Sequence, residues 1–393
     1  ASMAASCLTA SAANMKGSCT ADVLNVRSGA GTGYSKTGTV SYGDSLTILS
    51  ETTDSSGAKW YKISCGNLTG YVSAAYVQLT SSGSQGSSDA DFESYMTKQG
   101  FPESYKPYLR TLHEQHPKWI FTAQKLGVDW NTALKEECVV GRNLVHSSAL
   151  ASWKSMEKGA YDFNGGYWYG LDGSWVAASK EIIMYYMDPR NFLNDTYIFM
   201  FENQSYDPSY QTESGVKTIL ADTFMSKSYT CPDTKKKYTY SQTFMDAAKK
   251  SGVSPYHLAS RCRNEQGVNG APQSLGTVKG YENYFNFFDI QAYATSTMTA
   301  AEMGCKYKSI VGGSIFLGTG YITKGQDTLY LQKFDMVDGG NGLYYHQYMT
   351  CVFGQANEAI SLKNAYSQDI LNSAMEFKIP VYNNMPDKLC PKP

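Results

Sequence analysis

Short apolar runs alternate with polar residues in the first part of the chain. Such runs occur at residues 23–26, 39–40 and 46–48, and glycine-rich turns separate them. The alternation continues in KWYKISCGNLTGYVSAAYVQL, at residues 59–79. Apolar residues at every second position predict half-buried strands, and several short strands at this spacing predict a small β-barrel.

From about residue 91 the apolar positions change to helical spacing. A helix over residues 254–266 has Ser254 as N-cap, Pro255 at its first position and Gly267 just past its end. Proline or glycine also interrupts the other helical patterns. We predict these further helices over residues 91–99, 105–116, 174–187, 240–251 and 298–322.

A Ser/Gly-rich stretch, TSSGSQGSSDAD, separates the two patterns at residues 80–91 and is typical of a flexible linker. The chain is therefore predicted to be multidomain, with a small all-β domain before a mainly helical domain that contains some β structure. The start of the chain lacks the features of a signal peptide, so we interpret it as a processed or trimmed end. The predicted boundaries are a tail at 1–17, an all-β domain at 18–79, the linker at 80–91, a helical domain at 92–386 and a tail at 387–393.

The amino-acid composition indicates which kinds of molecule the protein binds. The 393 residues include 34 Lys+Arg against 35 Asp+Glu, so we expect no nucleic-acid partner. No run of about 18 apolar residues is present, so we expect no membrane span. The 31 Tyr, 16 Phe and 6 Trp favour stacking on neutral polymers such as glycans, although such surfaces also bind proteins.

Nine cysteines are scattered along the chain without CxxC or CxxH spacing, and the five histidines show no metal-ligand spacing either. We therefore expect no metal and no cofactor. In an oxidising compartment such cysteines form disulfides, and an odd count leaves at least one thiol unpaired or bonded to another chain.

Glu265 is the candidate for chemistry. Leu258, Cys262 and Glu265 fall at i, i+4 and i+7 of the predicted helix, which puts the carboxylate on an apolar face. Burial and the negative end of the helix dipole would both raise its pKa, as a general acid for glycosidic cleavage requires. The alternative is an exposed ion pair with Arg261, four residues earlier, and the spacing leaves both open.

The first domain resembles a bacterial-type SH3 domain. The resemblance rests on LNVRSG, the central GD and WYKI…GYVSAAYV, with Ala30 where that family often has proline. It implies a cell-wall-binding module. Cys19 precedes the first strand and Cys65 ends a late one, and because so small a barrel gains from a covalent link we expect them to be bonded.

The remainder resembles the endo-β-N-acetylglucosaminidases of glycoside hydrolase family 73, which are peptidoglycan hydrolases, in the extended form found in clostridial autolysins. The motifs that carry the resemblance are FPESYKPYLRTLHEQHPKW, LGVDWN, MDPRNFL…FMFENQSY, SPYHLASRCRNEQG, GYENYFNFFDIQAY, GQDTLYLQKF, HQYM and IPVYNNMP, in that order. The resemblance implies a lysozyme-like, mainly helical fold in which a small β-lobe flanks a sugar-binding groove.

Site residues follow from the matching positions. The family's catalytic acid falls on Glu265, and its cleft-lining YNFF stretch falls on Tyr284, Asn286, Phe287 and Phe288. For Phe285 and Phe287 we favour core packing. We assign sugar stacking to Tyr281, Tyr284 and Tyr330, and hydrogen bonding to the substrate to Gln332 and Gln347.

The second catalytic group stays open. An inverting or a double-displacement enzyme needs a second carboxylate, whereas a substrate-assisted enzyme uses the acetamido oxygen of the sugar. Glu282, in a loop-like stretch, and Asp289 are the candidates by position. Asp289 could instead brace the structure.

The expected protein is a secreted, wall-associated monomer that cleaves the β-1,4 bond between N-acetylglucosamine and N-acetylmuramic acid in bacterial peptidoglycan. Its SH3-like domain would hold stem peptides or cross-bridges. The alternatives are a non-catalytic wall-binding or adhesive protein, and a muramidase or lytic transglycosylase on the same fold.

Overall fold

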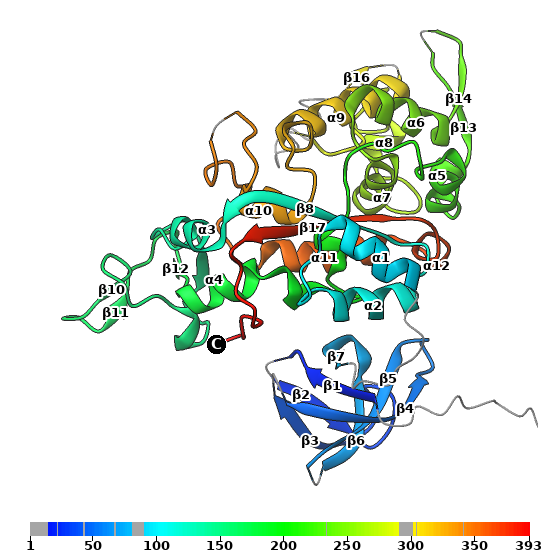
Figure 1. The fold of residues 1–393 in the computed structure, drawn as a ribbon. Helices are drawn as coiled ribbons and strands as arrows, with labels where there is room; N and C mark the ends of the chain where they lie inside the picture. Colours follow the sequence, from blue (N-terminus) through cyan, green and yellow to red (C-terminus); the bar gives the residue numbers. More distant parts are fainter. Residues whose placement is uncertain are drawn as a thin grey trace, which may run out of the picture. The chain divides into compact units, whose positions relative to one another are not determined.

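The computed structural model describes residues 15–21, 23–41, 44–66, 68–80, 90–232, 234–290, 302–303, 305–340 and 342–393. The chain divides into two compact units, Ala1–Tyr95 and Met96–Pro393 (Figure 1). Most of the predicted linker, at residues 81–89, and most of the predicted N-terminal tail, at residues 1–14, lie outside the described residues.

The first unit is an antiparallel sheet in the order β3-β2-β6-β5-β4-β1-β7. One buried cluster, which includes Val26, Ile48 and Ile63, forms its core. Period-two alternation places these residues on one face, as the sequence predicts. The strands are β1 (Met15–Cys19), β2 (Val23–Arg27), β3 (Lys36–Ser41), β4 (Ser45–Thr53), β5 (Lys59–Cys65), β6 (Leu68–Ser73) and β7 (Val77–Thr80).

Glycine is required at one position of this sheet. A Cβ atom on Gly70 would lie 2.5 Å from Val26 Cγ1 and 2.7 Å from the Arg27 carbonyl oxygen. Because the Arg27 carbonyl oxygen is part of the backbone of the adjacent strand β2, it cannot move without disturbing the pairing of β2 with β6.

The predicted bond between Cys19 and Cys65 is wrong, because Cys65 is a free thiol. Cys19 ends β1 and Cys65 ends β5, and β4 lies between these strands in the sheet. Strands two places apart are separated by about 10 Å, whereas a disulfide requires Cα atoms within about 7 Å. The sulfur of Cys19 instead lies 3.4 Å from the Ala21 carbonyl oxygen.

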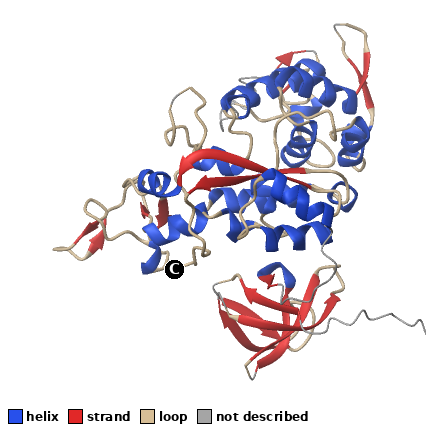
Figure 2. Cartoon of the chain, in the orientation of Figure 1, coloured by secondary structure: helices blue, strands red, loops and turns tan. Residues whose placement is uncertain are grey.

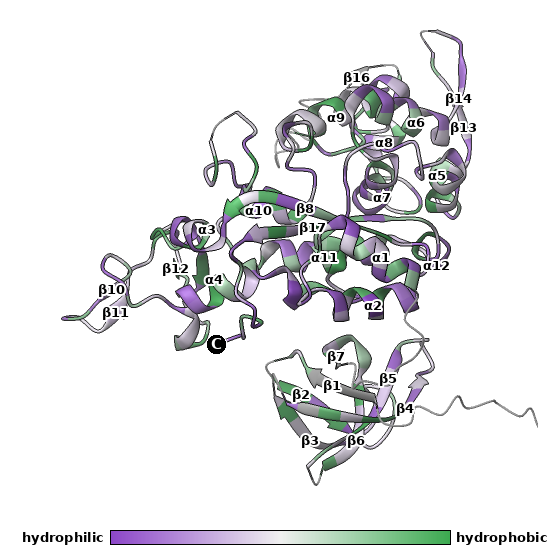
Figure 3. Ribbon diagram, viewed as in Figure 1, coloured by the Kyte–Doolittle hydropathy of each residue, from purple (hydrophilic) through white to green (hydrophobic). Residues whose placement is uncertain are grey.

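The second unit is mainly helical, as predicted (Figure 2). Hydrophobic residues concentrate on some helices, visibly on α4 (Figure 3), whose residues Ile182, Ile183 and Met187 are buried. The helices are α1 (Ala90–Gln99), which spans the division between the units, α2 (Lys106–Gln115), α3 (Trp130–Glu137), α4 (Lys180–Met187), α5 (Glu213–Leu220), α6 (Tyr240–Ser251), α7 (Pro255–Gln266), α8 (Pro272–Leu275), α9 (Lys306–Gly320), α10 (Leu329–Phe334), α11 (Gly354–Ala365) and α12 (Gln368–Leu371).

Two strands distant in sequence run side by side at the centre of this unit (Figure 1). Strand β8 (Ile120–Asp129) pairs in parallel with β17 (Glu376–Asn383), with Ile120 opposite Glu376 and Asp129 opposite Asn383. Phe121 and Phe377 are fully buried, so the pair contributes to the core. The other strands form short antiparallel pairs, β9 (Leu144–His146) with β12 (Trp175–Ala177), β10 (Tyr161–Asp162) with β11 (Tyr167–Trp168), β13 (Ser228–Thr230) with β14 (Lys237–Thr239), and β15 (Tyr284–Phe285) with β16 (Glu302–Met303).

Two predicted helices begin later than expected. The helix predicted over 174–187 begins at Lys180, since Trp175–Ala177 pairs with β9 instead, and Ser179 caps the helix by accepting from Ile182 N. The helix predicted over 298–322 begins at Lys306, and Glu302–Met303 is a strand. Residues 298–301 of that prediction lie outside the described part of the chain.

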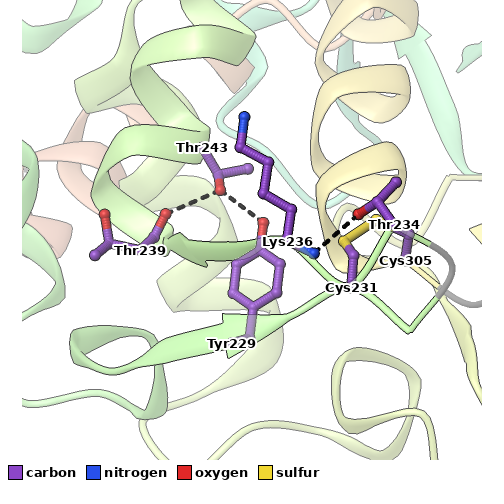
Figure 4. The surroundings of a disulfide bond; sticks show 7 residues. All are labelled: Tyr229, Cys231, Thr234, Lys236, Thr239, Thr243 and Cys305. Carbon is purple, nitrogen blue, oxygen red and sulfur yellow. Dashed lines mark hydrogen bonds between the residues drawn. A yellow bond between two sulfur atoms is a disulfide. The ribbon is translucent and has the colours of Figure 1, made fainter.

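A disulfide joins Cys231 to Cys305, with Cα atoms 5.0 Å apart. Cys231 directly follows β13, and Cys305 is the N-cap of α9 (Figure 4). Next to it, the Tyr229 hydroxyl lies 2.6 Å from Thr243 Oγ1 on α6. The bond therefore joins the β13–β14 hairpin to the start of α9. Within the described ranges, none of the helices has the length and apolar character needed to cross a bilayer.

Candidate functional site

Helix α7 positions Glu265 at its last turn, with the limits that the sequence predicts. Ser254 Oγ accepts a hydrogen bond from His257 N at 3.3 Å, and Pro255 occupies the first turn. The helix ends at Gln266, and Gly267 follows with a positive φ of 71°. These signals place the glutamate at the negative end of the helix dipole.

Both sequence interpretations of Glu265 contribute to what is observed. Leu258 and Cys262 are fully buried, so the carboxylate shares a buried face. Arg261 Nε donates to Glu265 Oε1 at 2.8 Å, so the ion pair also forms. The Glu265 side chain is only 25% exposed, and its Oε2 is buried without a hydrogen-bond partner. Oε1 of Glu265 is thus bonded to a cation, while Oε2 has no hydrogen-bond partner.

The pKa of Glu265 is raised to about 6. Burial is the largest cause, Arg261 acts in the opposite direction, and the negative charge of Asp289 raises the pKa further. The carboxyl group is therefore partly protonated near neutral pH, which is the state a general acid requires.

Residues 285–290 pack against α7. Gln266 Nε2 donates to the Phe287 carbonyl oxygen at 3.0 Å, and Cys262 Sγ lies 3.4 Å from the same oxygen. Phe285 and Phe287 are buried, which confirms their predicted core packing. The prediction that Asn286 and Phe288 contact substrate is wrong, because both side chains are buried, with 2% of each residue exposed.

The contacts of Asn286 and Phe288 explain their burial. Asn286 Nδ2 donates to the Ile290 carbonyl oxygen at 3.0 Å, and Asn286 Oδ1 accepts from Ile290 N at 3.2 Å, which closes a tight loop. The Phe288 ring fills the space beside Gly313 on α9, where a Cβ atom would lie 2.5 Å from the ring.

The two candidates for a second carboxylate differ in position. Asp289 accepts from Gln273 Nε2 at 3.0 Å, the bracing role considered from the sequence, and its charge also acts on Glu265. Glu282 is exposed, and its Oε1 accepts from Gly280 N at 3.1 Å. Hydrogen bonds from backbone N–H groups of its own loop lower the pKa of Glu282. Asp289 therefore contributes to the raised pKa of Glu265, whereas Glu282 is bonded to its own loop.

Among the predicted stacking residues, Tyr281 and Tyr284 are accessible and Tyr330 is not. Tyr281 is 50% exposed, and its ring lies 6.1 Å from that of Tyr284 in an edge-to-face arrangement. Tyr330 is fully buried, and its hydroxyl donates to the Met187 carbonyl oxygen at 2.5 Å and lies 2.6 Å from the Tyr382 hydroxyl. Its predicted stacking role is wrong, because the ring has no free face.

The amide groups of Gln332 and Gln347 are held by the protein. Gln332 Nε2 donates to Gln204 Oε1 at 2.8 Å and to the Gln326 carbonyl oxygen at 3.1 Å. Gln347 Nε2 donates to the Tyr344 carbonyl oxygen at 3.1 Å, in addition to a contact with Glu137 described below. Both amides are therefore fixed in orientation, and their N–H groups are already used within the protein, so each could offer a substrate only its oxygen.

Gln347 nevertheless lines a groove, which we call the Tyr345 groove. Its volume is about 560 Å³, within the range of about 300–1,000 Å³ typical of ligand sites. It is lined by Val139, Arg142, Tyr344, Tyr345, Gln347, Tyr348, Met349 and Thr350.

A buried ionic network lies beneath Gln347. Gln347 Nε2 donates to Glu137 Oε1 at 2.8 Å, and Lys333 Nζ donates to Gln347 Oε1 at 3.0 Å. Asn143 completes the network, since its Oδ1 accepts from Lys333 at 2.6 Å and its Nδ2 donates to Glu137 Oε2 at 2.7 Å. Burial raises the pKa of Glu137 and lowers that of Lys333, while each charge stabilises the other.

Glu358 on α11 is close enough to act electrostatically on Tyr348 of the Tyr345 groove, and Arg261 of α7 is close enough to act on Glu358. Tyr348 lines the groove, and the charge of Glu358 contributes to the raised pKa of Tyr348. Burial raises the pKa of Glu358 itself, and Arg261 opposes this effect. Arg261 therefore acts on two carboxyl groups, at Glu265 and at Glu358.

Sequence reasoning missed Glu137, Lys333, Glu358 and Arg142. Glu137 and Lys333 belong to different helices far apart in the chain, and no local periodicity links them. Their signal is only that each charged residue falls among apolar neighbours on its helix. Among the described residues, no group of three or more His, Cys, Asp or Glu side chains is arranged to hold a metal.

The chain matches one domain family and several curated proteins. Residues 22–78 match the bacterial SH3 domain. A bifunctional autolysin of Staphylococcus epidermidis is 27% identical over 229 residues, covering 53% of this chain and 16% of that protein. A beta-N-acetylglucosaminidase of Bacillus subtilis is 25% identical over 213 residues, covering 50% of this chain and 22% of that protein.

Solved structures show a weaker likeness. A major bifunctional autolysin aligns with a TM-score of 0.48 at 19% identity, covering 67% of this chain and 99% of that chain. The S. aureus glucosaminidase B aligns with a TM-score of 0.46 at 22% identity, covering 68% of this chain and 96% of that chain. The chain thus carries a bacterial SH3 domain at residues 22–78 and is homologous, over about half of its length, to bifunctional autolysins and to a beta-N-acetylglucosaminidase.

Proposed function

We propose that this protein is a peptidoglycan hydrolase of the family 73 type, which cleaves the β-1,4 bond between N-acetylglucosamine and N-acetylmuramic acid. Homology to autolysins and to a beta-N-acetylglucosaminidase supports the class of reaction. The observation that carries the proposal is the carboxyl group of Glu265, which combines a pKa of about 6 with a buried, unpartnered oxygen.

In the proposed reaction, Glu265 protonates the departing glycosidic oxygen. Its Oε1 is held by Arg261, so the unpartnered Oε2 is the oxygen that would carry the proton. Substrate binding would exclude water from the end of α7 and favour the protonated form further. As the proton leaves, Arg261 stabilises the carboxylate that forms.

For the second group we propose Asp289 rather than Glu282. Asp289 is the one whose charge acts on Glu265, and its hydrogen bond from Gln273 fixes its orientation. Two carboxyl groups close enough to influence each other can divide the roles of acid and of base or nucleophile. Glu282, exposed and bonded to its own loop, has neither feature.

The SH3 domain would hold the enzyme on the cell wall and raise the local concentration of substrate. Action on the wall requires an extracellular location. The disulfide between Cys231 and Cys305 supports this, because such bonds persist chiefly in oxidising compartments. We propose that the protein acts as a monomer.

The test is incubation of the full chain and its Glu265→Gln variant with purified bacterial sacculi. Loss of the acid should lower the release of soluble fragments by about 10²–10⁴-fold, without loss of sacculus binding. The exposed carboxylate of Glu114 on α2 provides a matched control, because Glu114→Gln should release fragments at the wild-type rate. Retained activity in Glu265→Gln would remove Glu265 from its role.

Mass spectrometry of the fragments distinguishes the alternatives. N-acetylglucosamine at the new reducing end supports the proposal. N-acetylmuramic acid there would indicate a muramidase, and an anhydro sugar a lytic transglycosylase. Binding without release of fragments from the unchanged protein would indicate a wall-binding protein.

A further inference from the structure

Arg142 lines the Tyr345 groove as a fixed cation. The guanidinium of Arg142 lies 4.9 Å from the centroid of the Tyr345 ring. Its Nη1 donates to the Glu136 carbonyl oxygen at 2.7 Å and to Glu136 Oε2 at 3.2 Å. Both hydrogen bonds are donated by Nη1, so the guanidinium is held by that nitrogen while Nε and Nη2 take no part in them. A guanidinium fixed in this way is a well-oriented donor for a carboxylate.

Glu136 only partly balances the charge of Arg142. The ion pair joins Glu136 Oε2 to Nη1 alone, with the Arg142 side chain 13% exposed and the Glu136 side chain 34% exposed. Lys333 beneath the groove is fully buried, and its Nζ donates to Asn143 Oδ1 and Gln347 Oε1, so its ammonium group is enclosed by the protein. The charge available to a ligand in the groove is therefore that of Arg142.

The rim of the groove has a strained backbone. Asp335 and Tyr344 both have positive φ angles, of 43° and 74°. Tyr344 N donates to the Asp335 carbonyl oxygen at 2.9 Å, and His346 N donates to Asp335 Oδ2 at 2.7 Å. Such conformations are unfavourable for residues other than glycine and occur often at binding sites. Here they hold Tyr345 at the rim with 72% of its surface exposed.

We propose that the Tyr345 groove binds the carboxylate-bearing muramyl unit of the glycan strand, and that Arg142 selects this unit over N-acetylglucosamine. This inference rests on the proposed function and specifies which sugar the groove accepts. N-acetylglucosamine is neutral, whereas a muramyl unit carries a carboxylate either on its lactyl group or on the attached peptide. Tyr345 offers a ring face to a sugar, and Arg142 offers its remaining N–H groups to the carboxylate.

The test measures binding to the full chain that carries Glu265→Gln, so that cleavage does not interfere. Three soluble probes are compared by calorimetry: chitotetraose, which has no carboxylate, peptide-free muramyl glycan fragments, and peptide-bearing fragments. Adding Arg142→Gln should weaken binding of a muramyl probe by about tenfold or more and leave chitotetraose unchanged, because a charge-assisted hydrogen bond is lost. Arg142→Lys should be intermediate.

Two controls separate recognition from folding and from net charge. Lys135→Gln removes one positive charge from the exposed side of α3 and should leave all three affinities unchanged. The SH3 domain is present in every variant, so peptide binding there cancels in the comparison. Thermal unfolding of Arg142→Gln should match that of the parent.

The pattern of loss identifies the source of the carboxylate. Weakening with peptide-free fragments assigns it to the lactyl group, and weakening with peptide-bearing fragments assigns it to the peptide. Equal weakening of chitotetraose, or no weakening of either muramyl probe, would overturn the inference. Failure of the proposed function is seen separately, as the absence of fragment release from sacculi by the chain with Glu265 intact.

Discussion

Glu265 at the end of α7 and Glu202 in the interior are similar carboxyl groups in different surroundings. Burial raises the pKa of both, to about 6 and about 8 respectively. In each, one oxygen has a partner, Arg261 or the Tyr366 hydroxyl, and Oε2 is buried without one. They differ in access, because the Glu265 side chain is 25% exposed and Glu202 is 3% exposed.

The comparison shows that a raised pKa alone does not identify a catalytic acid. A substrate can approach a partly exposed side chain such as that of Glu265, and proton transfer then requires only that the covered Oε2 be uncovered. The same group enclosed by the core can only affect stability, because no ligand can approach it. Glu137 is a further example of a raised pKa without a catalytic role. It is buried, and both of its carboxyl oxygens accept hydrogen bonds from side chains of the protein.

Among variants that test this comparison, the largest expected effect is on the rate at which soluble fragments are released from sacculi. Asp289→Asn should lower fragment release from sacculi by about 10²-fold or more, because the proposed second group is lost. Glu282→Gln, the matched change at the exposed candidate, should leave the rate within about twofold of wild type. A large loss in Glu282→Gln with a small one in Asp289→Asn would reverse the assignment.

The next effect concerns stability at Glu202. Its folded-state pKa is raised to about 8 from 4.5, so the folded protein holds this proton more tightly than the unfolded chain does. The stability that results is present below pH 4.5 and is lost as pH rises towards 8, at up to about 1.4 kcal/mol per pH unit. Urea unfolding between pH 5 and pH 8 should show a smaller decrease in Glu202→Gln than in wild type. Parallel pH profiles in the two proteins would contradict a buried neutral acid.

A smaller effect is expected in the pH dependence of activity. Arg261 lowers the pKa of Glu265, so Arg261→Met should raise it, and activity that needs the protonated acid should persist to higher pH. The alkaline limb of kcat/KM should move upward by about one pH unit. Lys249→Met, at an exposed position of α6, should leave the limb in place. A downward shift in Arg261→Met would mean that the limb does not report Glu265.

The smallest effects distinguish accessible from enclosed tyrosines. Tyr281→Ala should raise KM by about threefold to tenfold with little change in stability, because a stacking contact of roughly 0.5–1.5 kcal/mol is lost. Tyr330→Phe should leave KM unchanged and lower the free energy of unfolding by about 1 kcal/mol, since its buried hydrogen bond to Met187 is removed. Kinetics and urea unfolding of both variants check this pair.

Local signals predicted much of the fold. The caps of α7 and the period-two alternation of the first unit are each contained in a few neighbouring residues. The helix predicted over 174–187 was too long, because pairing of Trp175–Ala177 with β9 overrides local helical spacing. The parallel pairing of β8 with β17 joins distant segments, and no local pattern indicates the register.

The site was predictable where a helical position determines it and not where tertiary contacts do. Spacing along one helix placed Glu265 on the face of Leu258 and Cys262. Resemblance suggested that Tyr330 meets substrate, but its hydroxyl is bound inside the core. The ionic network beneath Gln347 and the cation at Arg142 depend on segments brought together only by folding.

The pairing of β8 with β17 also has a consequence for biosynthesis. Ile120 meets its partner Glu376 only after most of the second unit has been made, so β8 keeps an unpaired edge in any shorter nascent chain. If the protein is exported N-terminus first, this late closure would help to keep the second unit loose enough to be threaded. Truncation before Glu376 should therefore yield an aggregation-prone product rather than a smaller enzyme.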